Sequence, residues 1–237
     1  MTQAPPQIHE RTFATAEAAA EALAGAVADA LRGAGEARGR AALAVSGGKS
    51  PVVFFAALNR QPIDWTRVSI TLVDERWVDA ATADSNEHLL RSTLLAGPAG
   101  AARFVPLKTA AANPSAAVAE RTAALAQLPH PLDVVVLGMG DDGHTASLFP
   151  GRPGLEAALD PAGEARLAEI VPASAPHPRL GMTLRAILDS RLVCLQIQGP
   201  AKRRVYERAR AGVSPLEMPI AAVLSQAAVP VAVYLID

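Results

Sequence analysis

The chain has 237 residues, of which half are hydrophobic and 19% are charged, a composition that excludes an intrinsically disordered protein and permits a substantial buried core. Its formal net charge of −1 provides no general attraction to nucleic acid or to an anionic membrane, so neither is expected as a partner. No segment reaches the roughly 18 uninterrupted apolar residues of a membrane span, and no signal sequence is recognisable, so a cytoplasmic protein is expected.

Along the chain, apolar runs of strand length alternate with longer segments of helical pattern. Residues 1–7 are expected to be a loose tail. Strands are expected at Ile8–Phe13 (an edge strand), Ala41–Val45, Val68–Val73, Phe104–Pro106, Leu132–Leu137, Leu167–Val171, Leu192–Ile197 and Val231–Ile236. Helices are expected from Thr15 to about Arg32, at Pro51–Leu58, at Glu87–Leu95, from Asn113 or Ser115 to about Leu128, within residues 152–163, from Gly199 to about Ala211 and at Met218–Leu224. The segment Pro176–Leu184 is expected to pass into a further helix that runs through Asp189.

This alternation predicts an α/β fold with a mostly parallel sheet and helices on both faces. A single domain over residues 1–237 is expected from the chain length. Gly33, Gly35 and Gly39 are expected to form a flexible turn after the first helix. Cys194 is the only cysteine, which excludes an internal disulfide and a cysteine-based zinc site, and its apolar strand favours a buried, inert thiol.

The segment Leu132–Gly151 holds the most informative pattern. An apolar strand ends at Gly138-Met139-Gly140, and Asp141, Asp142, Gly143 and His144 follow at once. Histidine exchanges protons near neutral pH, so His144 at the carboxyl end of a strand is a candidate general base. A histidine hydrogen-bonded within the core remains the alternative. Thr145 and Ser147 are expected to cap a short helical turn.

Two other functions for this loop are disfavoured. Gly138, Gly140 and Gly143 match the dinucleotide-binding pattern, but that pattern normally follows the first strand, and the two aspartates would repel a pyrophosphate. A metal site is disfavoured because no second histidine lies two to four residues after His144.

The segment Ser46-Gly47-Gly48-Lys49-Ser50-Pro51 joins a buried strand to a helix N-terminus. Free backbone N–H groups and the helix dipole favour a phosphate there, and the glycines allow a ligand to approach the main chain. Leu43 stands where a P-loop would need its first glycine, so the segment is not a P-loop. A tight turn before a capped helix is the alternative without a ligand.

Further charged residues are candidates for the same site. Asp74-Glu75-Arg76 closes an apolar strand, and it forms either a solvated loop or part of the crevice that holds His144. Arg179 is able to clamp an anion with two hydrogen bonds. Lys202 lies in the first turn of its helix, where the dipole disfavours a cation unless an anion offsets the cost. For both cations, an ordinary solvated charge is the alternative.

Together these motifs resemble the 6-phosphogluconolactonases, within the wider glucosamine-6-phosphate isomerase/6-phosphogluconolactonase superfamily. The matching segments span about residues 41 to 203, and they are SGGKSP, VDERWV, DSNE, LGMGDDGHTASLFPG, PHPRLGMTL and GPAKR. The resemblance implies a Rossmann-like three-layer sandwich of the isomerase/lactonase type. It also implies hydrolysis of 6-phospho-D-glucono-1,5-lactone to 6-phosphogluconate in the pentose phosphate pathway, by a monomer without metal or cofactor.

The resemblance also implies roles for individual residues. His144 would activate water against the lactone carbonyl, and Asp142 would orient or tune it. Asp74 and Arg76 would line the reacting end. The residues implied to hold the 6-phosphate are Ser46, Gly47, Gly48, Arg179 and Lys202, with Lys49 as a helper.

Two alternative functions are weighed against the lactonase. The amino-sugar isomerase/deaminases carry a glutamate shortly after the DGH loop, where this chain has Ser147, Leu148, Phe149 and Pro150. A sugar-phosphate sensor without catalysis would lack the base and would usually carry a DNA-binding module. The sequence leaves open the roles of Asp141, His88 and His177, the group that orients His144, and the strand order.

Overall fold

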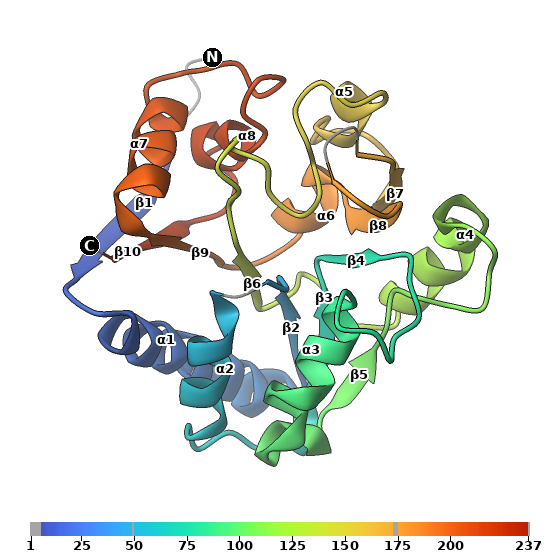
Figure 1. Cartoon of the computed structure of the whole chain (residues 1–237). Helices are drawn as coiled ribbons and strands as arrows, with labels where there is room; N and C mark the ends of the chain where they lie inside the picture. Colours follow the sequence, from blue (N-terminus) through green and yellow to red (C-terminus); the bar gives the residue numbers. More distant parts are fainter. Residues whose placement is uncertain (1–5, 49, 173–174, 237) are drawn as a thin grey trace.

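Seven parallel strands form the main sheet, in the order β1-β10-β9-β6-β2-β3-β5, within the residues that the computed structural model describes (6–48, 50–172 and 175–236). A smaller antiparallel sheet, β4-β8-β7, stands beside it (Figure 1). The strands are β1 (Ile8–Phe13), β2 (Ala41–Val45), β3 (Val68–Leu72), β4 (Asp74–Arg76), β5 (Arg103–Val105), β6 (Val134–Leu137), β7 (Leu167–Ile170), β8 (Arg179–Met182), β9 (Val193–Gln198) and β10 (Val231–Ile236). The α-helices are α1 (Ala16–Arg38), α2 (Pro51–Asn59), α3 (Asn86–Ser92), α4 (Pro114–Leu125), α5 (Leu155–Ala158), α6 (Leu184–Leu188), α7 (Gly199–Arg210) and α8 (Ile220–Ser225).

Helices cover both faces of the main sheet, as the alternation of elements predicted (Figure 1). On one face, α1 packs along β2 and against α2. On the other face, α7 lies against β9 and beside α8. The central strands β2 and β6 are buried along their whole length, because a parallel strand covered on both faces meets no water. The α/β class with a mostly parallel sheet is therefore confirmed.

The chain changes its direction of travel across the main sheet between β2 and β6. From β2 it moves outward through β3 to β5, then returns to β6 and continues to β9 and β10. Loops that leave the carboxyl ends of β2 and β6 therefore diverge and open a crevice, which is where α/β sheets bind ligands. Ser46 follows β2 and Gly138 follows β6, so both candidate loops begin at this crevice.

The small sheet corrects two expectations. Asp74–Arg76 is strand β4 rather than a loop, and Arg179–Met182 is strand β8 rather than the start of a helix, which begins only at Leu184. β8 pairs with β4 on one side and with β7 on the other, so its backbone groups are satisfied by residues distant in sequence. β7 belongs to this antiparallel sheet, not to the parallel one.

The first helix is longer than expected. It continues to Arg38, so Gly33 and Gly35 lie within it instead of forming a turn. Glycine costs about 1 kcal/mol relative to alanine in a helix interior, but Leu31 and Ala34 are buried on the same helix and compensate by packing. The helix ends at Gly39, whose φ of +72° suits a glycine C-cap.

Among the described residues, every helix is too short or too polar to traverse a lipid bilayer.

Candidate active site

Glycines shape the loop that follows β6. The Gly140 N–H donates to the His144 carbonyl (2.9 Å), and the Gly143 N–H donates to the Gly140 carbonyl (3.1 Å). A Cβ atom on Gly140 would lie 2.1 Å from the imidazole of His144, so only glycine leaves room for this ring. Gly143 has a φ of +79°, which also favours glycine. The loop therefore places the His144 ring in a defined position.

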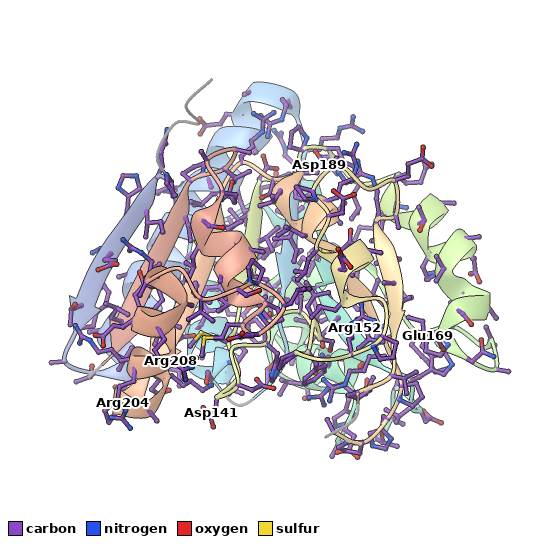
Figure 2. All side chains as sticks on the ribbon, turned by 90° about the horizontal axis from the view of Figure 1, so that it is seen from above. Asp141, Arg152, Glu169, Asp189, Arg204 and Arg208 are labelled. Atoms are coloured by element: carbon purple, nitrogen blue, oxygen red, sulfur yellow. The ribbon has the colours of Figure 1, made fainter. Side chains whose placement is uncertain are left out.

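Asp142 orients the imidazole of His144. Its Oδ1 atom lies 2.6 Å from His144 Nδ1 and also accepts the His144 backbone N–H (3.1 Å). A carboxylate at this position favours a proton on Nδ1 and leaves the lone pair of Nε2 for a water molecule. Asp141 is exposed and lies at the outer edge of the molecule in Figure 2.

Within residues 144–151, all of which are described, a tight turn forms instead of the expected helical turn. The Leu148 N–H donates to the Thr145 carbonyl (2.7 Å). The hydroxyl of Thr145 donates to the Gly138 carbonyl (2.8 Å), and the hydroxyl of Ser147 donates to the Asp74 carboxylate. Both hydroxyls thus bind groups outside their own turn, so neither caps a helix.

The loop after β2 forms a second wall. The Ser46 N–H donates to the Val136 carbonyl (3.0 Å), and its hydroxyl accepts the Gly138 N–H (3.1 Å), which ties this loop to the His144 loop. A Cβ atom on Gly47 would lie 2.0 Å from Asn86 Oδ1, and Gly48 has a φ of +104°. No side-chain cap is found among the described residues at the start of α2, so its first N–H groups can receive an anion. The expected helper Lys49 lies outside the described residues.

The small sheet contributes Asp74, Arg76 and Arg179. Arg76 and Arg179 face each other across the ladder of β4 and β8. The Nε atoms of both arginines are buried and have no hydrogen-bond partner among the described residues. Burial lowers the pKa of Arg179, and Asp74 partly opposes this. Two adjacent guanidinium groups with unused buried donors are well suited to an anionic ligand.

One cavity of about 240 Å³ joins these segments. Lys202 reaches it from the first turn of α7, whose N-cap residue Gln198 makes no capping hydrogen bond through its side chain. Asp142 is not among the lining residues, but it contacts His144, which lines the cavity. The expected site residues that line the cavity are Ser46, Gly47, Gly48, Asp74, Arg76, His144, Arg179 and Lys202.

Two residues that line this cavity, Asn86 and Ser147, and a third that packs beside it, Phe149, were not expected from the sequence to belong to the site. Asn86 donates to the Asp74 carbonyl (2.9 Å), and Ser147 bonds the Asp74 side chain. Phe149 is buried between two site residues: its ring centroid is 4.3 Å from that of His144 and 4.9 Å from Arg179 Cζ. All three residues lie in the DSNE and DGHTASLFPG segments, and their position in these motifs is the sequence feature that could have identified them.

Two further histidines, His177 and His130, have partners other than the proposed site residues. His177 Nε2 lies 3.0 Å from Asp84 Oδ2, and the Asp84 carbonyl accepts from Arg76 Nη1 (2.6 Å). His130 lies 3.1 Å from Asp189, away from the cavity. Among the described residues, no group of three histidine, cysteine, aspartate or glutamate side chains is arranged to hold a metal ion.

A family model for glucosamine-6-phosphate isomerases/6-phosphogluconolactonase matches residues 14–231 of this chain. The chain belongs to this family. A 6-phosphogluconolactonase from Pseudomonas putida is 46% identical over 218 residues, which are 92% of this chain and 89% of the relative. A 6-phosphogluconolactonase from Mesorhizobium japonicum is 50% identical over 198 residues, which are 83% of this chain and 82% of the relative.

A solved structure shows the same architecture. The crystal structure of a 6-phosphogluconolactonase from Shewanella baltica superposes with a TM-score of 0.94 at 41% identity and covers 98% of each chain. The match to the isomerase/lactonase family includes every residue placed at the cavity, from Ser46 to Lys202. The resemblance drawn from the motifs is therefore confirmed.

Proposed function

We propose that this protein is a 6-phosphogluconolactonase, which hydrolyses 6-phospho-D-glucono-1,5-lactone to 6-phospho-D-gluconate in the oxidative branch of the pentose phosphate pathway. The observation that carries the proposal is the His144–Asp142 pair at a cavity that also holds Arg179, Lys202 and the anion-binding loop after β2. The identity of 44–50% to curated 6-phosphogluconolactonases over most of the chain supports the same activity.

His144 acts as the general base. Its Nε2 takes a proton from water while the water oxygen bonds to the lactone carbonyl carbon. The tetrahedral intermediate then collapses, the bond from this carbon to the ring oxygen breaks, and the proton passes from the imidazolium to the ring oxygen. Asp142 holds the ring through Nδ1 and stabilises the imidazolium as it forms.

The other site residues bind and orient the substrate. Arg179, Lys202 and the loop of Ser46, Gly47 and Gly48 hold the 6-phosphate, with Lys49 as a helper. Asp74 and Arg76 line the reacting end. Arg76 lies opposite Arg179 across the ladder, so the small sheet supplies a residue to each end of the substrate site.

The isomerase/deaminase alternative is disfavoured by Phe149. Its ring lies 4.3 Å from the imidazole of His144, in the part of the loop where the isomerases place their acid. A phenyl ring cannot transfer a proton to a sugar ring oxygen. A sensor without catalysis is disfavoured by the intact His144–Asp142 pair.

The test is hydrolysis of 6-phosphogluconolactone by the wild type and by His144→Ala, corrected for the spontaneous rate. The variant is expected to lose about 10²–10⁴-fold in kcat, the usual contribution of a positioned general base. Asp141→Asn, an exposed neighbour on the same loop, is the matched control and should keep its activity. Normal turnover by His144→Ala would refute the role of His144, and ammonia release from glucosamine 6-phosphate would support the isomerase.

We also propose that the chain acts as a monomer and folds as a single domain, because one chain supplies every group of the site. Light scattering should give a mass near 24.5 kDa, and heating should produce one unfolding transition. The cytoplasmic location remains a prediction that cell fractionation can test.

A further inference from the structure

The side chain of Ser147 lies between the carboxylate of Asp74 and the guanidinium of Arg179. Its hydroxyl donates to Asp74 Oδ2 and accepts a hydrogen bond from Arg179 Nη1 (3.1 Å). Arg179 Nη1 and Asp74 Oδ2 form an ion pair at 3.9 Å, which is too long for a direct hydrogen bond. All three residues are buried, with Ser147 only 2% exposed. The serine hydroxyl thus bridges the two charged groups and lies where a direct, hydrogen-bonded pair would otherwise form.

The backbone of Ser147 has an unfavourable conformation. Ala146 and Ser147 have φ values of +48° and +62°, and the Leu148 N–H closes the turn on Thr145. Consecutive positive φ values are typical of a type I′ turn, in which glycine or asparagine is usual. Residues held in this region by their surroundings cluster at functional sites. Here the conformation directs the hydroxyl toward the Asp74 and Arg179 side chains.

The guanidinium of Arg179 keeps unused donors as a result. Its Nε atom is buried and has no hydrogen-bond partner among the described residues. The ring of Phe149 packs against its face, 4.9 Å from Cζ. A direct, two-point pair with the Asp74 carboxylate would occupy those donors, because the fork of arginine fits a carboxylate as well as a phosphate.

We propose that Ser147 is a positioning residue that keeps Asp74 and Arg179 apart, so that Arg179 remains available to the substrate phosphate. The hydroxyl satisfies the carboxylate with its own proton and takes one N–H of the guanidinium, and the other N–H groups stay free for the ligand. The inference rests on the proposed function, in which Arg179 holds the 6-phosphate.

The test begins with Ser147→Gly. Glycine removes the hydroxyl and accepts the positive φ without strain, whereas alanine would keep the strain. The KM for 6-phosphogluconolactone is expected to rise about tenfold, and the Kd for the product 6-phosphogluconate is expected to rise by a similar factor. This factor corresponds to the loss of about one charge-assisted hydrogen bond. The effect on kcat should be below threefold. Ser190→Ala, which removes another buried serine hydroxyl bonded to the Ile187 carbonyl (2.7 Å), should leave KM unchanged.

A double-mutant cycle separates positioning from general destabilisation. Asp74→Asn removes the charge that would attract Arg179, and binding of 6-phosphogluconate is followed by calorimetry instead of activity. Ser147→Gly should weaken binding about tenfold when residue 74 is aspartate, and by less than twofold when it is asparagine. Ser147→Ala provides a second measurement should the glycine variant not fold.

An equal loss of binding in both backgrounds would mean that Ser147 has a merely structural role and would overturn the proposal. Unchanged binding in Ser147→Gly would overturn it as well. Arg179→Ala distinguishes failure of the underlying function: if this variant binds 6-phosphogluconate normally, the assignment of Arg179 to the phosphate is wrong, whatever Ser147 does.

Discussion

At the scale of single residues, the site depends on what the His144 ring touches. Gly140 leaves room for it on one side, Asp142 holds Nδ1, and the ring of Phe149 packs against it with an angle of 34° between the two planes. Phe149 also packs against the guanidinium of Arg179, so one apolar side chain contacts both the proposed base and the arginine proposed to bind the phosphate. Aromatic contacts of this kind contribute about 0.5–1.5 kcal/mol beyond burial.

Phe149→Leu should therefore impair catalysis more than folding. We expect kcat/KM for 6-phosphogluconolactone to fall about tenfold, because loss of roughly 1.4 kcal/mol of positioning corresponds to that factor. The free energy of unfolding should decrease by about 1 kcal/mol, since leucine retains most of the buried volume. Urea titration and steady-state kinetics measure the two effects, and a loss of stability without a loss of kcat/KM would contradict the supporting role.

Three buried weak acids make the protein sensitive to alkaline pH. Burial raises the pKa of Cys194, Tyr206 and Tyr234, each to about 12. The folded state therefore keeps protons that the unfolded state releases, so the stability these groups contribute is present below their unfolded pKa values and is lost as pH rises toward 12.

The free energy of unfolding is accordingly expected to fall between about pH 9 and pH 12, as followed by urea titration. The Cys194→Ala variant lacks the thiol. Its free energy of unfolding should therefore fall less than that of the wild type as pH rises through the pKa of an unfolded thiol. A free energy of unfolding that stays constant over this range would show that the three groups titrate alike in both states.

At the scale of elements, glycines with different surroundings have different functions. Gly47 lies in the loop after β2 against Asn86, with no room for a Cβ atom. Gly25 lies within α1, and nothing approaches the position of its missing Cβ atom within 4 Å. The same substitution should therefore have opposite consequences at the two positions.

Gly47→Ala is expected to displace Asn86 or the loop and to raise the KM for the phosphorylated lactone at least tenfold, the loss of about one charge-assisted hydrogen bond. Gly25→Ala should leave KM unchanged and raise the free energy of unfolding by about 0.5–1 kcal/mol, because alanine is the better helix former. Unchanged KM in Gly47→Ala would show that the loop does not bind the phosphate.

At the scale of the whole molecule, the proposed active site lies between two sheets. The His144 loop, the Ser46 loop and Lys202 follow strands of the main sheet, whereas Asp74 and Arg179 belong to the small sheet. Gly181 of β8 is the point of close approach, since a Cβ atom there would lie 2.7 Å from the Ala146 carbonyl oxygen and 2.8 Å from Ile170 Cδ1.

Gly181→Ala should push the small sheet away from the turn that holds Ser147. We expect kcat/KM to fall by tenfold or more and the free energy of unfolding to decrease by about 1–3 kcal/mol, the usual cost of overpacking. Full activity together with a lowered melting temperature would show that the site tolerates movement between the sheets.

The sequence by itself determined the α/β class, most elements of the main sheet and the two loops at the crevice, and it singled out His144 as the proposed base. These features depend on local patterns: an apolar run makes a buried strand, and Gly140 and Gly143 permit the loop that carries the histidine. It also indicated the cations Arg179 and Lys202, which the structure brings to one cavity.

Only the tertiary structure decided that Arg179–Met182 is a strand, that α1 continues through Gly33 and Gly35, and that Ser147 bonds Asp74 and Arg179 instead of capping a helix. Each outcome depends on partners distant in sequence. Asp74 is 73 residues from Ser147, and β8 gains its backbone bonds from β4 and β7. Local secondary-structure propensity contributes less free energy than such long-range hydrogen bonds and packing. A prediction from local propensity therefore could not find these three features.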